Sequence, residues 1–146
     1  MNKSVLILMA DDDPDDRLLA QDALAECQLQ SEIQFVENGE ELLDYLRHRG
    51  KYAQGGAPRP SLILLDLNMP RKDGREALRE IKTDPDLRRI PVIVLTTSKA
   101  ETDISKIYEL GANSFISKPV TFDALVNVMK ALGQYWLRTV ELPPSK

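Results

Sequence analysis

The sequence predicts an α/β protein with a doubly wound parallel sheet of five strands, each followed by a helix. Short apolar runs of strand length alternate along the chain with segments whose apolar residues recur at helical spacing. The sequence contains no hairpin signal and no internal repeat. Because parallel strands need long crossover connections, this alternation favours a parallel sheet with helices on both faces.

The first strand is expected at Val5–Ala10, a continuous apolar run that ends at Asp11. Pro14 suits the first turn of the helix that follows, and Asp13 suits its N-cap. This helix is expected to end near Cys27 and to bury an apolar stripe made of Leu18, Leu19, Ala23 and Leu24.

The second strand is the short alternating segment Ile33–Val36. Asn38–Gly39 supplies a turn and a cap, and the next helix is marked by Leu42, Leu43 and Leu46. Residues Gly50–Pro60, which contain two glycines in a row and two prolines, are predicted to form a loop.

The third strand is Leu62–Asp66, whose apolar run is typical of a strand buried on both faces. Asp73–Gly74 opens a helix that ends at Thr83–Pro85 and carries Ala77, Leu78 and Ile81. A short turn at Asp86–Arg89 leads to the fourth strand, Pro91–Leu95.

A fourth helix is expected from about Glu101 to Leu110, closed by Gly111, and the fifth strand is Ser114–Ser117. The last helix is expected from about Thr121 past Trp136, with a core stripe made of Leu125, Val128, Met129, Leu132 and Trp136. The natural arrangement of these elements is the flavodoxin-like strand order 2-1-3-4-5, in which the ligand site lies between strands 1 and 3.

Composition narrows the class of protein. The chain has 146 residues, enough for one domain with a substantial core, and a net charge of −4. Because the charge is negative and no basic stripe carries interleaved aromatic residues, direct nucleic-acid binding is not expected. Cys27 is the only cysteine, and neither a signal peptide nor a membrane span is recognisable, so a cytoplasmic location is expected.

Four of the predicted strands end in polar residues suited to phosphoryl chemistry. Strand 1 ends in Asp11–Asp13, strand 3 in Asp66, strand 4 in Thr96 and its hydroxyl neighbours, and strand 5 in Lys118. Three carboxylates at one sheet edge repel one another unless a cation binds, and Mg²⁺ prefers such oxygen ligands, with Mn²⁺ as a substitute.

A set of ligands and roles follows from this arrangement. Asp12 and Asp66 are the expected side-chain ligands, with Asp11 acting through a water molecule and the carbonyl of Asn68 as a third direct ligand. Asp66 is also a candidate nucleophile toward phosphorus, with Thr96 and Lys118 holding phosphoryl oxygens. Taken singly, each feature has a simpler explanation, such as a helix cap, a strand-end hydroxyl or a solvated lysine.

The chain resembles a response-regulator receiver domain from about Lys3 to Leu132. The motifs that carry this resemblance are Ile7–Pro14, Leu64–Pro70 with Asp73–Gly74, Val94–Thr97, and Gly111–Ala112 through Phe115 to Lys118–Pro119. The resemblance implies that a histidine kinase phosphorylates Asp66, and that Mg²⁺ is held by Asp11, Asp12, Asp66 and the Asn68 carbonyl. It also implies that Thr96 is the switch hydroxyl, Phe115 the switch aromatic residue and Lys118 the phosphate-binding lysine.

The loop Arg49–Pro60 and the tail Tyr135–Pro143 are similar to those of single-domain regulators that serve cyanobacterial and bacterial phytochrome kinases. Such relatives commonly dimerise through the face formed by helix 4, strand 5 and helix 5. We therefore expect one receiver domain over residues 1–146, with its core at about 3–132 and a helix extension and tail at 133–146. The candidate interface residues in the tail are Tyr135, Leu137, Val140 and Leu142.

Two other functions are compatible with part of this pattern. Haloacid-dehalogenase-type phosphatases need a second aspartate two residues after the nucleophile, and Asn68 occupies that position, so an enzyme is not expected. A pseudo-receiver that binds partners without phosphorylation usually lacks an acid, the acceptor or the lysine, whereas this chain has all of them. His48, the only histidine, is expected at a helix end on the surface, without a metal or phosphorelay role.

Overall fold

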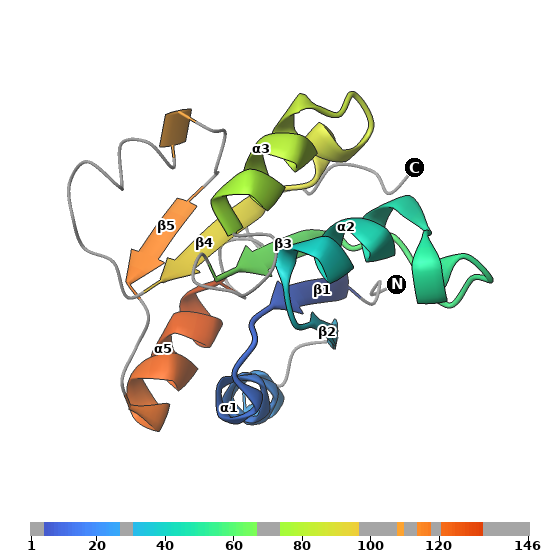
Figure 1. Ribbon diagram of the computed structural model, residues 1–146. Coiled ribbons are helices and arrows are strands. Elements are labelled where there is room, and N and C mark those ends of the chain that lie inside the picture. The colour runs from blue at the N-terminus through green and yellow to red at the C-terminus, as the bar shows by residue number, and fades with distance from the viewer. Residues whose placement is uncertain are drawn as a thin grey trace, which may run out of the picture.

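The computed structural model describes residues 5–26, 31–66, 74–96, 108–109, 114–117 and 121–132. It contains the predicted parallel sheet, in the order β2-β1-β3-β4-β5 (Figure 1). The strands are β1 (Val5–Ala10), β2 (Ser31–Val36), β3 (Leu62–Leu65), β4 (Val92–Thr96) and β5 (Ser114–Ser117). The predicted fold class is therefore confirmed.

Helices cover both faces of the sheet. The described helices are α1 (Pro14–Glu26), α2 (Gly39–Arg47), α3 (Gly74–Thr83) and α5 (Phe122–Leu132), with short 3₁₀ turns η1 (Gly50–Tyr52) and η2 (Leu87–Arg89). In Figure 1, α1 and α5 lie on one side of the sheet, and α2 and α3 lie on the other. The helix predicted at about 101–110 falls mostly outside the described residues. No helix within the described ranges is long and apolar enough to cross a membrane.

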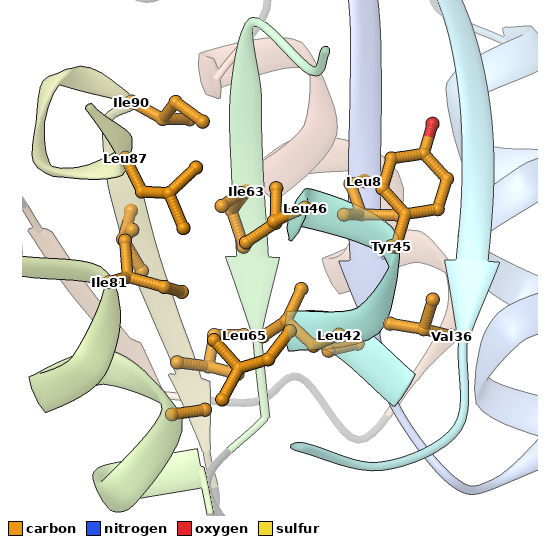
Figure 2. Packing of buried hydrophobic residues seen from close by; sticks show 14 of the residues in the cluster. Leu8, Val36, Leu42, Tyr45, Leu46, Ile63, Leu65, Ile81, Leu87 and Ile90 are labelled. Carbon is orange, nitrogen blue, oxygen red and sulfur yellow. The ribbon is translucent and has the colours of Figure 1, made fainter. Parts of the chain in front are cut away.

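Alternate residues of the central strands build two separate cores. Leu8, Ile63 and Leu65 face α2, α3 and η2, where they pack with Leu42, Leu46, Ile81 and Leu87 (Figure 2). The intervening residues, including Met9, Leu62 and Leu64, face α1 and α5. Because β3 is buried on both faces, its four residues are all apolar, which explains the continuous run in the sequence.

Predicted caps begin the first two helices. The backbone N–H of Asp15 donates to the side chain of Asp13 at 2.9 Å, and Asp15 and Asp16 lie in the first turn of α1. The backbone N–H of Glu41 donates to the side chain of Asn38 at 2.8 Å. His48 ends α2 in the left-handed conformation with φ 54°, exposed as predicted.

The predicted apolar stripe of α1 is partly wrong. Ala23 and Leu24 are buried as expected, but Leu18 is 58% exposed and Leu19 is 37% exposed. Ala20 takes their place in the core. The helix therefore turns a face with two alanines toward its neighbours, and that face is where α1 contacts α5. In α5, Leu125 and Met129 are buried and Val128 is half-buried, whereas Trp136 lies outside the described residues.

Candidate functional site

Backbone hydrogen bonds bring Asp11 and Asp66 to one edge of the sheet. Asp11 directly follows β1, and Asp66 directly follows β3, which pairs with β1 through Ala10 and Leu65. The N–H of Asp66 donates to the Ala10 carbonyl at 3.0 Å, so the parallel pairing continues one residue beyond the strands. This position, between β1 and β3 at their carboxyl ends, is where the strand order predicts a ligand site.

Three carboxylates meet at this edge. Asp11, Asp12 and Asp66 each offer one oxygen, and these oxygens all lie within 4.8 Å of one another. Asp11 is fully buried and Asp66 is only 6% exposed, whereas Asp12 is exposed. Two buried carboxylates beside a third carry a high local negative charge, and a bound cation would neutralise it.

The donor set fits a small hard cation. Opposite ligands of Mg²⁺ in octahedral geometry are about 4.2 Å apart, because each metal–oxygen distance is about 2.1 Å. A separation of up to 4.8 Å is compatible with such an ion once one carboxylate is reached through water or the side chains close slightly. The exposed Asp12 side chain can close toward such an ion, whereas the buried Asp11 is the carboxylate expected to act through water.

The turn from β1 to α1 is held by a compact set of hydrogen bonds. The carboxylate of Asp11 accepts from the N–H of Asp13 at 2.9 Å, and the N–H of Asp11 donates to the Val36 carbonyl at 3.0 Å. Nη1 of Arg17 donates to the Asp11 carbonyl at 2.9 Å. Arg17 was not predicted from the sequence. It directly follows the acidic run 11–16 and is the only basic residue of α1, which was a signal that could have identified it.

The junction between β2 and α2 lies beside this turn and contains a second residue that the sequence interpretation missed. The carboxylate of Glu41 accepts from the Glu37 N–H at 2.7 Å and from the Tyr52 hydroxyl at 2.6 Å, and it pairs with Lys51 at 2.8 Å. Burial raises the pKa of Glu41, but the hydrogen bonds from Lys51, Tyr52 and Glu37 outweigh it and hold the pKa below its usual value. The start of α2 is thereby tied to the loop after it.

The other predicted site residues are placed only in part. Thr96 is the last residue of β4, which lies next to β3, and its backbone pairs with Ser117 of β5. Phe115 lies in β5, beside Val94 of β4. The side chains of Thr96 and Phe115 lie outside the described residues, and so do Asn68, Lys118 and the tail residues Tyr135, Leu137, Val140 and Leu142.

Comparison with known proteins shows which protein family has a similar sequence. A family model described as the response regulator receiver domain matches residues 7–130. The curated protein "Response regulator Rcp1" of the cyanobacterium Synechocystis sp. is 42% identical over 144 residues, covering 99% of this chain and 97% of Rcp1.

Two solved structures are similar over almost the whole chain. The phosphorylated cyanobacterial phytochrome response regulator RcpA is 45% identical with a TM-score of 0.90, covering 97% of this chain and 100% of RcpA. The Mn²⁺-bound form of Rcp1 is 41% identical with a TM-score of 0.88, covering 96% of this chain and 99% of the other. The fold and the close phytochrome-regulator relatives expected from the sequence are thus confirmed.

Proposed function

The chain belongs to the response regulator receiver domain family, and from that membership we propose that Asp66 accepts a phosphoryl group from a sensor histidine kinase in a Mg²⁺-dependent reaction. The observation that carries this proposal is the placement of the Asp66 carboxylate. It is 6% exposed, it lies at the carboxyl end of β3, and one of its oxygens is within 4.8 Å of oxygens of Asp11 and Asp12.

The step is a transfer from nitrogen to oxygen. A carboxylate oxygen of Asp66 forms a bond to phosphorus while the phosphorus–nitrogen bond of the kinase phosphohistidine breaks, and the bonding electron pair stays on the imidazole nitrogen. Asp66 thereby becomes an acyl phosphate. Its position between β1 and β4 orients the attacking oxygen, and its burial limits access of water to the product.

The metal ligands proposed here are Asp12 and Asp66 directly, Asp11 through water, and the carbonyl of Asn68. When bound, Mg²⁺ or its substitute Mn²⁺ would neutralise charge that develops on the phosphoryl oxygens. The Mn²⁺-bound form of the relative Rcp1 supports a divalent cation at such a site. Thr96 and Lys118 are assigned to the remaining phosphoryl oxygens on the strength of family membership.

The output of the reaction is a change of surface. The phosphoryl group adds up to about two negative charges, toward which Thr96 would move while Phe115 fills the vacated space. The altered face would be formed by helix 4, β5 and α5, and it is the proposed homodimer interface, extended by Tyr135, Leu137, Val140 and Leu142. The similar protein RcpA is named as a phytochrome response regulator, which supports a phytochrome histidine kinase as the donor. The proposal also includes a cytoplasmic location and a downstream protein partner.

The test is intact-mass spectrometry after incubation with acetyl phosphate and Mg²⁺. The wild-type protein is expected to gain the mass of one phosphoryl group, and the gain should disappear in Asp66→Asn and in the presence of EDTA. Asp22→Asn, which removes a carboxylate from an exposed position of α1, is the matched control and should label normally. An unlabelled wild type would overturn the proposal and favour a module that binds partners without phosphorylation.

A further inference from the structure

The peptide that joins Asp11 to Asp12 is held from the first helix. Nη1 of Arg17 lies 2.9 Å from the Asp11 carbonyl oxygen, which belongs to that peptide. We propose that Arg17 is a positioning residue that aims the acid pair Asp11–Asp12 at the metal. This inference rests on the proposed function, because it concerns the geometry of the cation ligands.

Arg17 is itself anchored. It lies in α1, with a half-buried side chain, and its backbone N–H donates to the Asp13 carbonyl at 3.1 Å. Its guanidinium therefore reaches back over one helical turn to the strand end from which the helix departs. Both ends of the bridge are fixed, one by the helix and the other by β1.

Holding this carbonyl limits how the backbone can turn between Asp11 and Asp12. A peptide unit is planar, so the orientation of the Asp11 carbonyl sets ψ of Asp11 and φ of Asp12 together. Asp11 is also held by two further hydrogen bonds. Its N–H donates to the Val36 carbonyl, and its carboxylate accepts from the Asp13 N–H. The side chain of Asp12 is exposed, so the peptide plane, which sets the direction of its Cα–Cβ bond, is the described element that orients it toward Asp11 and Asp66.

The charge of Arg17 alone predicts the opposite effect. A guanidinium near three carboxylates competes with a metal cation, so removing its charge should tighten Mg²⁺ binding on electrostatic grounds. If Arg17 acts by positioning, its removal should loosen the Asp11–Asp12 peptide and weaken binding. The two mechanisms therefore differ in sign, and one affinity measurement separates them.

The experiment compares Mg²⁺ and Mn²⁺ affinities of the wild type, Arg17→Gln, Arg17→Lys and Arg79→Gln by calorimetric titration. Arg79 is an exposed residue of α3, so its variant is the control for loss of one positive charge. We expect the dissociation constant to rise about 10-fold in Arg17→Gln, as for other residues that orient metal ligands. Arg17→Lys, which retains a donor, should fall between Arg17→Gln and the wild type, and Arg79→Gln should match the wild type.

A readout without metal accompanies the titration. In the metal-free protein, the amide protons of Asp12 and Asp13 should exchange faster in Arg17→Gln than in the wild type, while the melting temperature changes little. If Arg17→Gln does not fold, the Arg17→Lys variant alone decides, through a weaker affinity than the wild type.

Equal or tighter metal binding by the folded Arg17→Gln or Arg17→Lys variant would overturn the positioning role. That result leaves the proposed function intact when the wild type binds Mg²⁺ and is phosphorylated on Asp66. A wild type that binds neither Mg²⁺ nor Mn²⁺ would overturn both.

Discussion

At the scale of single residues, Glu41 links the start of α2 to the loop that follows the helix. In the usual capping box, the third helical residue reaches back to the N–H of the cap. Here Glu41 reaches one residue further, to the Glu37 N–H, while Asn38 accepts from Glu41 in the normal way. The same carboxylate binds the Tyr52 hydroxyl, so this variation on the box also positions η1.

Replacing Glu41 by Gln should lower the free energy of unfolding by about 1–2 kcal/mol at neutral pH, because charge-assisted hydrogen bonds are lost. The folded-state pKa of Glu41 is lowered from its ordinary value of 4.5. The contribution of the Glu41 carboxylate to the free energy of unfolding is thus present above pH 4.5 and is lost as the pH falls through the folded-state pKa. Urea unfolding near pH 7 and near pH 4 checks this. Glu40→Gln, in the same helical turn, is the control, and a constant difference at both pH values would contradict the prediction.

Lys82 is a second residue with a consequence for stability. Its Nζ donates to the carbonyls of Arg88 and Ile90 at 3.1 and 2.7 Å, and burial lowers its pKa from 10.5 to about 8. Between these values the unfolded chain binds the proton more strongly than the folded chain, so stability should rise with pH.

The wild type should therefore gain about 1 kcal/mol over Lys82→Met between roughly pH 7 and pH 9.5, after allowance for partial exposure. Urea unfolding of both proteins across this range measures the gain. Parallel pH profiles would show that the lysine is not desolvated in solution.

At the scale of elements, α1 shows what sequence patterns leave open. Its apolar residues allow two faces, one with Leu18 and Leu19 and one with Ala20, Ala23 and Leu24. The larger and more hydrophobic leucines were predicted to be the buried residues. The rotation of the helix is set instead by the turn from β1, with Asp13 as cap, and by contact with α5.

The two faces predict different mutational costs. Leu24→Ala should destabilise the protein by about 2–5 kcal/mol because it empties a buried site, whereas Leu18→Ala should change stability by less than about 0.5 kcal/mol. Thermal or urea unfolding of the two variants distinguishes them. Equal losses would mean that Leu18 is covered in solution.

Strands were more predictable than helix faces. The run Leu62–Leu65 is apolar throughout, as a strand buried on both sides requires, and the strand order then places Asp66 beside Asp11. Arg17 and Glu41 were not predicted because their partners are backbone atoms, the Asp11 carbonyl and the Glu37 N–H. Helix caps such as Asp13 and Asn38 have a recognisable pattern of residue types, whereas these two contacts do not follow such a pattern.

At the scale of the whole molecule, the three clustered carboxylates are expected to lower the stability of the metal-free protein. Two buried carboxylates beside a third repel one another when no cation is present. Asp66→Asn should therefore raise the free energy of unfolding in EDTA by about 1 kcal/mol, even though it removes the proposed phosphoacceptor. Added Mg²⁺ should stabilise the wild type more than the variant.

Urea unfolding with EDTA and with Mg²⁺ measures both effects, and Asp22→Asn again serves as the control for a lost exposed charge. A variant that is less stable than the wild type in EDTA would contradict the expected repulsion. It would indicate that the Asp66 carboxylate is stabilised in the metal-free protein by its surroundings.

The pairing of β1 with β3 also has a consequence for biosynthesis. Asp11 and Asp12 precede β3 in the chain, so they leave the ribosome before the strand that Asp66 follows. Until that later strand docks, the nascent chain cannot assemble the complete three-carboxylate cluster, and non-local parallel pairing is intrinsically slow. If Asp66 accepts a phosphoryl group as proposed, this ability would arise only after β3 has docked beside β1, and translation intermediates that end before β3 would lack it.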